Sequence, residues 1–446
     1  MSSYQVAYVP IGVPTFHLES ANDQFTRSVA LLNTLTDDCI CPTSPLLQLE
    51  DLKAYLKTLD ADLVILQNTT FANSAYATEV MKATDCPVLL WTLREPVIDG
   101  TRLRLNSLTG AYSAGNLMHH MGRDQYEYIF GGPEEAQVIA TIDATIKAAK
   151  LKHALKSLTI AAIGQTPQGF GFGRGMDAEV ARNFGANLES IEARALMTIA
   201  NNYKEEDYAY LREEANRKTL GLDQLPEANV DGFLRLYKAY QSFVDDNNIG
   251  AIASRCWPDF FTEYKTPVCG VLGMLNDVQV AASCEADLYG ALSMYAGIQL
   301  SNEPVFFGDP VSLNEADSTV TFWHCGTAAC SLARPDKGPT MGVHPNRQIG
   351  PTMEFGCKPA DHVTLFRIGR NPDASFRLFI AKGQALDAPQ QFYGTSVVVQ
   401  TQMNAGELVS KSVKEGWEPH FVVIYKDVAK ELEVFGHMMG FDVFNY

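Results

Sequence analysis

Leu63-Val-Ile-Leu66 is a short apolar run that follows Ala61-Asp62, and runs of this kind decide the fold predicted for the start of the chain. Four to six apolar residues bounded by polar ones are typical of a buried strand. Further strands are expected at Gln5–Pro10, Cys39–Pro42 and Val88–Trp91, and helices at Asp23–Leu35, Leu49–Leu59, Ala75–Ala83 and Gly110–Gly122. Short strands that alternate with helices form parallel βαβ units, so the sequence predicts an open, doubly wound sheet.

A second α/β domain is predicted from about residue 156. A charged helix at Pro133–His153 leads to a new strand at Leu158–Ile163, and the alternation of strands and helices then resumes. The expected elements are a helix from Asp177, a strand at Leu188–Ile191, a helix at Phe233–Asp246, and strands at Ala251–Ala253 and Val278–Ala282. Both α/β domains are therefore expected to hold Rossmann-like parallel sheets.

The pattern changes after Phe306, where strands separated by Gly, Pro and Asn turns replace the alternation with helices. The expected strands are Val320–Trp323, Val363–Ile368, Arg377–Ala381 and Ser396–Gln400, and one helix begins near Val428. The predicted fold class is thus α/β, with two Rossmann-like domains at 1–155 and 156–310 and a β-rich C-terminal domain at 311–446.

Composition narrows the classes of function. The 446 residues are 46% hydrophobic and 20% charged, as in a globular protein, and the net charge of −17 argues against nucleic acid or an anionic membrane as partner. We find no signal peptide and no stretch long enough to span a membrane. The nine cysteines have no zinc-site spacing beyond a single Cys39-x-Cys41, so we expect reduced thiols in a cytoplasmic protein.

Two distant segments carry the residues best suited to chemistry. His420 follows Pro419 at the start of an apolar strand, and Cys284-Glu-Ala-Asp287 follows the strand at Val278–Ala282. One imidazole and carboxylates from separate segments suit a divalent cation such as manganese. An alternative for Asp287 is a helix N-cap, with the helix at Leu288–Ala296.

Other candidates follow predicted strands, where ligands bind in α/β sheets. Trp257, Asp259 and Glu263 come after Ala251–Ala253, and the two carboxylates are four residues apart, so that both could lie on one side of a helical turn. The alternative for this pair is a solvated helix start. His324 ends the strand Val320–Trp323, where a structural hydrogen bond is the commoner role.

The glycine-rich segment Gly164–Gly175 also lies between a strand and a helix, but it does not fit a phosphate-binding loop. Gly169, Gly171 and Gly173 lack the G-x-G-x-x-G spacing, and no Lys-Ser/Thr pair follows them. We expect it to line a cleft.

The chain resembles L-fucose and L-arabinose isomerases over essentially its whole length. The resemblance lies in the order and spacing of several segments: Arg94-Glu-Pro, Gly100-Thr-Arg-Leu-Arg-Leu-Asn106, Cys256-Trp-Pro-Asp259, Cys284-Glu-Ala-Asp287, His324-Cys-Gly326, and Pro419-His420 through Asp427. It implies two α/β domains with a β-rich C-terminal domain, and an aldose–ketose isomerase that uses Mn²⁺ or a similar divalent ion such as Mg²⁺ or Co²⁺.

The resemblance also implies site residues. Asp287 and His420 correspond to metal ligands, and Glu263 has the spacing of the remaining glutamate, which binds metal and moves protons; Glu285 and Asp259 are the competing carboxylates. Asp287 and Glu263 are the expected catalytic residues. The residues expected to contact the sugar are Trp257, Asp259, His324, Arg94 and Asn106. The resemblance implies a homo-oligomer with sites near subunit interfaces, where Phe16, His17 and the Asn106–Gly110 loop would reach a neighbour.

The chemistry of the reaction agrees with these residue types. Moving a sugar carbonyl from C1 to C2 requires a base to remove a carbon-bound proton and a cation to stabilise the enediolate. Two further hypotheses stay open. An anionic sugar, phosphorylated or sulfonated, is suggested by Arg94, Arg102, Arg104 and Arg255, unless these arginines are solvated or pair with Glu95 and Asp99. A non-catalytic sugar-binding protein is the second.

Overall fold

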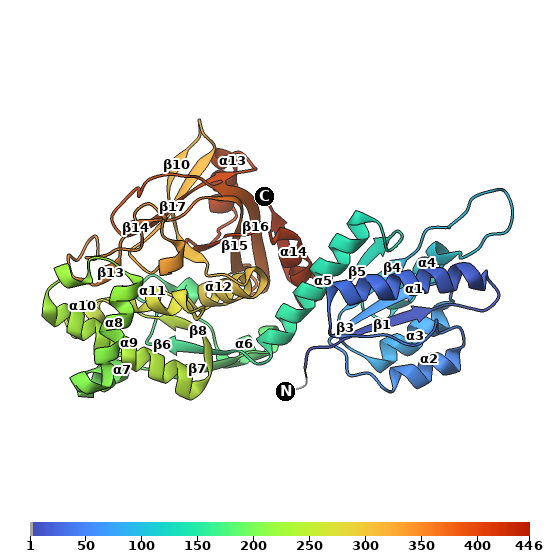
Figure 1. The fold of residues 1–446 in the computed structure, drawn as a ribbon, viewed down its shortest axis with the longest axis horizontal. Coiled ribbons are helices and arrows are strands. Elements are labelled where there is room, and N and C mark those ends of the chain that lie inside the picture. The colour runs from blue at the N-terminus through green and yellow to red at the C-terminus, as the bar shows by residue number, and fades with distance from the viewer. Residues whose placement is uncertain (1–2) are drawn as a thin grey trace. The chain divides into compact units, whose positions relative to one another are not determined.

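The computed structural model describes residues 3–446, which form two compact units (Figure 1). The first unit comprises Met1–Ala154 together with Lys430–Gly440, and the second comprises Leu155–Ala429 together with Phe441–Tyr446. None of the helices described within residues 3–446 has the length and apolar character needed to cross a membrane.

A five-stranded, fully parallel sheet forms the centre of the first unit, with strand order β2-β1-β3-β4-β5. Its strands are β1 (Val6–Ile11), β2 (Cys39–Ile40), β3 (Leu63–Asn68), β4 (Val88–Thr92) and β5 (Tyr126–Phe130). Its helices are α1 (Leu18–Leu35), α2 (Leu49–Leu56), α3 (Ser74–Ala83), α4 (Ser107–His120) and α5 (Ala136–Leu155).

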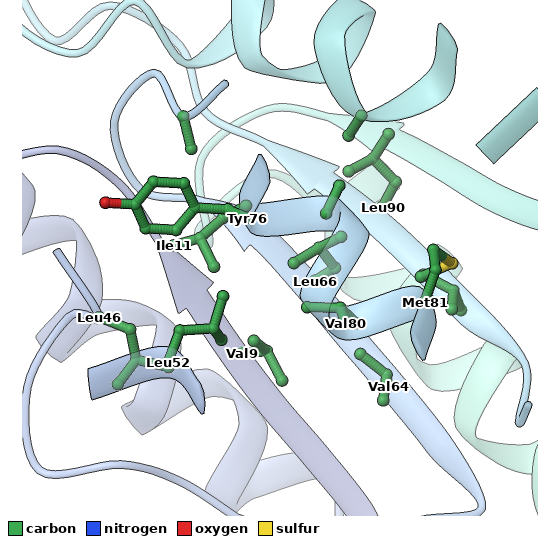
Figure 2. Close-up of a cluster of buried hydrophobic side chains, with 14 of the residues drawn as sticks. Val9, Ile11, Leu46, Leu52, Val64, Leu66, Tyr76, Val80, Met81 and Leu90 are labelled. Atoms are coloured by element: carbon green, nitrogen blue, oxygen red, sulfur yellow. The ribbon is translucent and has the colours of Figure 1, made fainter. Parts of the chain in front are cut away.

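The core of this unit lies between the sheet and the helices α2, α3 and α4. Strand side chains such as Val9, Val64 and Leu66 meet Leu52 of α2 and Val80 of α3 (Figure 2). Because β1, β3 and β4 are buried along their whole length, their sequences are continuous apolar runs rather than alternating ones. This burial explains why the strands were predictable.

The C-terminal helix α14 (Ala429–Met439) packs in the first unit although it lies near the end of the chain. Its buried side chains include Leu432, Phe435 and Met438. His437 Nδ1 lies 2.7 Å from Glu127 Oε1 on β5, and Lys152 Nζ donates to the Met438 carbonyl at 2.9 Å. The first unit is therefore built from both ends of the sequence.

The second unit begins with a four-stranded parallel sheet of order β7-β6-β8-β9. Its strands are β6 (Thr159–Ile163), β7 (Asn187–Ile191), β8 (Ile249–Ser254) and β9 (Ala281–Ser283). Its helices are α6 (Asp177–Phe184), α7 (Ala193–Asn202), α8 (Glu205–Lys218), α9 (Glu227–Asn247), α10 (Asp259–Thr262), α11 (Cys269–Asp277) and α12 (Leu288–Ser301). The second unit also contains three short 3₁₀ helices, which are η1 (Gly171–Gly173), η2 (Leu222–Gln224) and η3 (Cys330–Leu332).

An eight-stranded mixed sheet follows, with order β14-β17-β11-β10-β18-β15-β16-β19. Its strands are β10 (Phe306–Asn314), β11 (Thr319–His324), β14 (Phe355–Gly356), β15 (Ala360–Arg370), β16 (Phe376–Ala385), β17 (Thr395–Thr401), β18 (Phe421–Ile424) and β19 (Asp442–Asn445). A separate pair joins β12 (Met341–Gly342) to β13 (Thr352–Met353), and helix α13 is Ala405–Lys414. Strand β18 lies between β10 and β15, which fixes the surroundings of His420.

The predicted fold class is confirmed: two parallel α/β sheets precede a β-rich region. The elements that the sequence did not predict include β5, α7, α8, α11, β10, α13 and β19. Strand β5 is only partly buried along its length, so it lacks the apolar run that marked the others. The two units are divided between Ala154 and Leu155, and the three predicted domains, with boundaries at 155 and 310, stay a prediction.

Candidate active site

Strand register brings three polar residues to one end of β18. Gly308 of β10 is opposite Phe421, which places Asp309 beside His420, the residue before Phe421. On the other side, β15 pairs Phe366 with Val422, so Arg367 lies next to the same strand end. Because residues directly opposite in a register are only about 5 Å apart, Asp309 is brought to His420, whereas Arg367 reaches Asp287.

The turn between β9 and α12 supplies the carboxylates. Glu285 and Ala286 both have left-handed backbone conformations, with φ of 59° and 55°. Such conformations are uncommon for residues other than glycine and cost about 1 kcal/mol or more each. The turn is held by a hydrogen bond from the Ala286 amide to the Ser254 carbonyl at 2.9 Å. Strain of this kind at a polar cluster is typical of a functional site.

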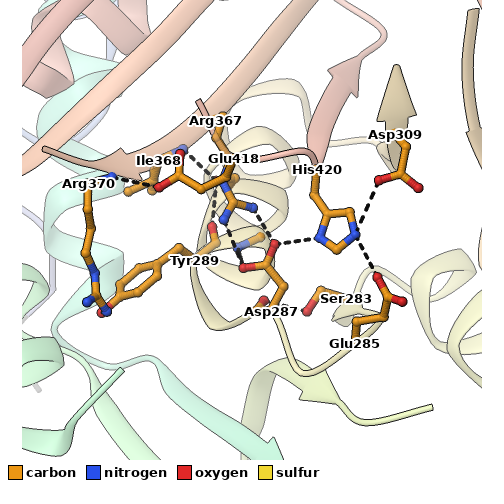
Figure 3. A network of polar contacts seen from close by, with 12 residues as sticks. Ser283, Glu285, Asp287, Tyr289, Asp309, Arg367, Ile368, Arg370, Glu418 and His420 are labelled. Atoms are coloured by element: carbon orange, nitrogen blue, oxygen red, sulfur yellow. Dashed lines mark hydrogen bonds and ion pairs between the residues drawn. The ribbon is translucent and has the colours of Figure 1, made fainter. Parts of the chain in front are cut away.

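Asp287 forms a fully buried ion pair with Arg367 (Figure 3). Arg367 Nη1 donates to Asp287 Oδ2 at 2.5 Å and Nη2 donates to Oδ1 at 3.0 Å. Asp287 Oδ1 also accepts from the Gly290 amide at 2.9 Å, so this residue is the N-cap of α12. The N-cap alternative for Asp287 is therefore confirmed.

His420 connects the two carboxylates of the turn (Figure 3). Its Nδ1 lies 2.9 Å from Asp287 Oδ2, and its Nε2 lies 3.0 Å from Glu285 Oε2. Asp309 Oδ1 lies 3.5 Å from the same Nε2 atom. The imidazole has no exposed surface, and a carboxylate behind Nδ1 is the usual way in which a protein orients a histidine whose Nε2 binds or reacts.

Two opposing effects set the pKa values in this cluster: burial disfavours the charged form of each group, and close partners of opposite charge favour it. Burial disfavours the charged imidazole, but the hydrogen bonds to Asp287 and Glu285 outweigh it and raise the pKa of His420 to about 9. Burial likewise opposes ionisation of Asp287, but Arg367 and His420 hold the pKa of this carboxyl well below its usual range. Burial raises the pKa of Asp309, and the nearby charges of Glu285 and Asp287 add to the rise.

Two more predicted residues join the cluster. Trp257 Nε1 donates to Glu285 Oε1 at 3.1 Å, which fixes this carboxylate from the other side. His324, at the end of β11, has its ring centroid 5.8 Å from that of His420. A ligand atom of His324 lies within 4.8 Å of those of Glu285 and His420, so the three side chains could share one cation.

The glycine-rich segment Gly164–Gly175 covers the cluster with two aromatic rings. Phe170 and Phe172 have ring centroids 6.4 and 5.6 Å from that of His420, and Phe170 also contacts Trp257. Gly173 packs directly on the turn, since a Cβ atom there would lie 2.8 Å from Asp287 Cα. The expectation that this segment lines a cleft is confirmed, since its two ends, Gly164–Thr166 and Gly173–Gly175, border a cavity, and its two phenylalanines also cover the imidazole.

The donor set suits a divalent cation. Glu285 and Asp309 face the His420 Nε2 atom, and among the residues described neither carboxylate has an arginine or lysine partner. Their ionic partner among these residues is the His420 imidazole, and a cation bound between the three groups would offset the negative charge of both carboxylates in its place. Two carboxylates with one or two imidazoles are ligands that Mn²⁺ and related ions accept. The two carboxylate oxygens of Asp287 make four contacts, with Arg367, Gly290 and His420. Asp287 therefore supports His420 from the Nδ1 side and is not one of the groups that face Nε2.

Glu263 and Asp259 are not brought to this cluster. Both face Arg194 of α7, with Arg194 Nη2 3.7 Å from Glu263 Oε1 and 3.8 Å from Asp259 Oδ1. The Glu263 side chain is 55% exposed, and Asp259 pairs with Arg255 Nε at 2.6 Å. The two carboxylates do share one side of a turn, as predicted, but that side is the solvated start of α10. Glu285 occupies the position beside His420 that was expected for Glu263.

Arg94 and Asn106 belong to the first unit. Arg94 donates from Nε and Nη2 to the two oxygens of Glu135 at 2.7 and 2.8 Å. Asn106 is the left-handed residue that precedes α4, and its amide is one of three that point at the Glu95 carboxylate. Arg104 lies 3.4 Å from Asp99. The pairing considered as an alternative is thus observed for Arg104 with Asp99, whereas Arg94 pairs with Glu135 rather than with Glu95 or Asp99, and the sugar-binding roles stay predictions.

Sequence reasoning missed Asp309, Arg367 and the two phenylalanines. Arg367 left a usable signal, because a charged residue inside the apolar run Val363–Ile368 requires a buried partner. Asp309 follows the apolar Val305-Phe306-Phe307 in the same way that Asp287 follows a strand. Phe170 and Phe172 left no signal, since only the tertiary structure shows which ring they cover.

Similarity to known proteins extends over the full chain. A sulfoquinovose isomerase from Clostridium sp. (strain MSTE9) is 59% identical over 439 residues, which is 98% of this chain and 98% of that protein. The chain belongs to the sulfoquinovose isomerase family. Members from Alkalicoccus urumqiensis and Priestia aryabhattai are 35% and 34% identical, and the matches cover 98% and 99% of this chain and the same shares of those proteins.

Membership in this family confirms that the chain is an enzyme, a sugar aldose–ketose isomerase. The closer assignment to L-fucose and L-arabinose isomerases stays a prediction, and no family model matches the sequence. A solute-binding protein of an ABC transporter from Agrobacterium vitis, bound with alpha-D-tagatopyranose, gives a TM-score of only 0.16 at 14% identity over 68% of this chain and 91% of that chain. That likeness is too low to favour a non-catalytic binding protein.

Proposed function

We propose that this chain interconverts sulfoquinovose, a sulfonated aldose, and the corresponding ketose, with a divalent cation held by Glu285, His420 and Asp309. The single observation that supports the proposal best is the convergence of these three groups on one point in a buried cluster. The names of relatives that match the whole chain support the substrate.

The metal-binding part of the proposal assigns each group a role. Glu285 and the His420 Nε2 atom are the principal ligands, and Asp309 and His324 complete the set. A bound divalent cation would stabilise the negative charge that develops on the sugar oxygens as the carbonyl moves. Asp287 is a positioning residue, because its contact with Nδ1 keeps Nε2 directed at Glu285. Mn²⁺ is the first candidate, and Mg²⁺ and Co²⁺ are alternatives.

Proton transfer falls to Asp309 in this scheme. Its side chain is 30% exposed, more than those of Glu285 and Asp287, so it can approach a bound sugar. Burial raises the pKa of Asp309, which makes this carboxyl a better proton acceptor than an ordinary aspartate. Asp287, enclosed by Arg367, has no free lone pair for this task. The earlier expectation that Asp287 and Glu263 are catalytic is therefore replaced by Asp309 in our proposal.

A sulfonate group needs a cationic partner, and Arg174 is the best candidate in the second unit. It directly follows Gly173 in the segment that covers His420, and its Nε donates to Thr166 Oγ1 at 2.6 Å. Within the part of the chain that the structure describes, Arg174 has no carboxylate partner, in contrast to Arg255, which pairs with Asp259. Its guanidinium is thus free to hold a tetrahedral anion through two hydrogen bonds.

The test compares sugars with and without the sulfonate. Purified protein is incubated with Mn²⁺ and either sulfoquinovose or the same sugar lacking the sulfonate, and NMR follows the ketose. In D₂O, deuterium should appear at the carbon that gives up its proton, because the enediol route exchanges that proton with solvent. Equal rates on the two sugars would reject the sulfonate assignment. Product without deuterium would reject Asp309 as a base that exchanges with solvent.

The Arg174 assignment is tested by substitution. We expect Arg174→Gln to raise KM for the sulfonated sugar and to leave the slow reaction of the unsulfonated sugar unchanged. Arg182→Gln on α6 is the matched control, because Arg182 lies outside the covering segment. Equal effects of Arg174→Gln on both sugars would show a structural role instead.

Cytoplasmic location and a homo-oligomer also belong to the proposal. All nine cysteines are free thiols, which agrees with a reducing compartment. Exposed apolar side chains gather near Asn106 in the first unit, and they include Ile98 at 93% and Tyr112 at 75%. Exposed apolar side chains of this kind suit contact with a second copy. Light scattering of the purified protein measures the assembly, and a monomer that retains full activity would contradict it.

A further inference from the structure

Four of the nine cysteines gather behind the active-site cluster. The thiol of Cys284 interacts electrostatically with those of Cys256, Cys269 and Cys325, and it shares with Cys325 and His324 a group whose ligand atoms are all within 4.8 Å of one another. These cysteines come from four separate segments: the end of β8, the start of α11, the turn after β9 and the end of β11. All four are buried, and because the sequence contains no C-x-x-C spacing, their proximity could not be predicted from it.

Two of these thiols are already at the spacing that a metal requires. The Sγ atoms of Cys269 and Cys325 are 3.7 Å apart. Two sulfurs bound to one tetrahedral Zn²⁺ at about 2.3 Å are separated by about 3.8 Å. This pair could therefore hold a zinc ion without moving apart or together.

A histidine adds a nitrogen ligand to the pair. A ring nitrogen of His344, in the loop between β12 and β13, lies with the Cys269 and Cys325 sulfurs in a group whose ligand atoms are all within 4.8 Å of one another. The ring of His344 is held edge-on against Phe261, with centroids 5.0 Å apart. Cys284 belongs to a second such group with Cys325 and His324, and we assign it as the fourth ligand, so the set becomes three thiols and one imidazole.

This donor set differs in kind from the proposed catalytic one. Three sulfurs and one nitrogen prefer a thiophilic, borderline-soft ion such as Zn²⁺, whereas carboxylates prefer Mn²⁺ or Mg²⁺. The four groups leave no position for a substrate oxygen, which is the mark of a structural site rather than a catalytic one. The two sites would therefore select different metals.

We propose that Cys269, Cys284, Cys325 and His344 form a structural zinc site in the second unit. The bound ion would tie α11 and the turn after β9 to the end of β11 and to the β12–β13 loop. Each element comes from a different part of the chain, so a single ion would close several long loops and stabilise the fold.

The site would also act on the neighbouring cluster. Cys325 Sγ lies 3.3 Å from His324 Nδ1, and His324 faces Glu285 and His420. A zinc ion that fixes Cys325 would thereby fix the orientation of His324. The effect of zinc on the catalytic cluster through His324 rests on the proposed function, but the binding of zinc to the thiols does not.

The experiment measures metal and ligands directly in the full-length protein. Protein purified without chelator is analysed for zinc, and apo-protein is then titrated with Co²⁺. We expect up to about two cobalt ions per chain, one in each proposed site, and the one bound by thiols should give an intense sulfur-to-cobalt charge-transfer band and the visible bands of tetrahedral coordination. The catalytic ligands, being oxygen and nitrogen, cannot give that charge-transfer band, so Glu285→Gln should retain it.

Substitutions assign the ligands. Cys269→Ser and His344→Gln should each weaken or abolish the band, whereas Cys330→Ser, a buried cysteine outside the group, should leave it unchanged. Circular dichroism checks folding, and if a variant fails to fold, Zn²⁺ protection of the wild-type thiols from alkylation gives the same answer. Absence of the band in folded wild-type protein, or a Cys269–Cys325 disulfide found by mass spectrometry in place of two thiols, would overturn the zinc site.

Discussion

The buried pair of Asp287 and Arg367 is the residue-level feature on which the cluster depends. We expect Asp287→Asn to leave Arg367 buried without a counter-charge and to cost about 3–5 kcal/mol of unfolding free energy, measured by urea denaturation. Asn can still cap α12, so the loss reports the charge pair. The double variant Asp287→Asn with Arg367→Met should recover part of the stability. A change below about 1 kcal/mol in the single variant would contradict a buried, charged pair.

Glu285 and Glu263 form a matched pair of residues for testing the site. Glu285 lies 3.0 Å from His420 Nε2, whereas Glu263 faces solvent and Arg194. We expect Glu285→Gln to lower kcat/KM by about 100-fold or more, because it removes a proposed metal ligand. Glu263→Gln should stay within about twofold of the wild type, as surface substitutions usually do. Steady-state kinetics with Mn²⁺ measure kcat/KM of both variants. A larger loss in Glu263→Gln than in Glu285→Gln would favour Glu263 as the metal-binding carboxylate.

At the scale of elements, the covering segment depends on the close approach of Gly173 to the start of α12. A Cβ at Gly173 would meet Asp287 Cα at 2.8 Å, whereas one at Gly171 would meet nothing within 4 Å. We expect Gly173→Ala to displace Phe170 and Phe172 and to lower kcat/KM by about tenfold or more, since small misplacements near a site are costly. Gly171→Ala is the control and should leave kinetics unchanged. Equal losses of kcat/KM in both variants would show that activity depends on the flexibility of the covering segment and not on the contact between Gly173 and Asp287.

The attachment of α14 to β5 should depend on pH through His437. The hydrogen bond to Glu127 raises the pKa of His437 above its ordinary value of about 6.5. The charged pair therefore stabilises the fold fully below pH 6.5 and is lost as the pH rises through the raised pKa. Because the His437 side chain is 46% exposed, solvent screens the pair, and its contribution is about 0.5 kcal/mol or less.

His437→Gln measures that contribution. The unfolding midpoint of the variant should fall below that of the wild type at pH 6 and approach it at pH 9. His119→Gln is the control, because His119 pairs with Asp124 only at the exposed end of α4. If the difference in unfolding midpoint between the wild type and His437→Gln instead grew as the pH rose, the prediction that the charged pair stabilises the fold at low pH would be wrong.

At the scale of the whole molecule, removal of metal should separate the two proposed sites. We expect dialysis against EDTA to abolish isomerase activity, and Mn²⁺ to restore it, because Glu285, Asp309 and His420 bind hard or borderline ions reversibly. Zn²⁺ in the thiol site should resist the same treatment longer, since buried structural sites exchange slowly. Full activity in protein shown by elemental analysis to be metal-free would reject the catalytic metal.

The fold was predictable where burial leaves a pattern in the sequence. Strands β1, β3 and β4 are buried on both faces and read as apolar runs, whereas β5 is half-exposed and was missed. His420 and Asp287 were foreseen as partners, and they do meet, because each follows or opens a strand. Glu285 was kept only as a competitor, since sequence spacing cannot show that left-handed residues turn its side chain toward His420. The four converging thiols were invisible for the same reason: their proximity is set by tertiary packing.

Because α14 belongs to the first unit, synthesis of the protein imposes an order on its assembly. The ribosome translates residues 1–154 first, but the helix that completes this unit, Ala429–Met439, follows the whole of residues 155–428. The apolar side of α14, with Leu432, Phe435 and Met438, can take its place only after those intervening residues have been translated. A fragment that stops before residue 429 would thus leave the early unit with an uncovered apolar surface, open to chaperones while translation continues.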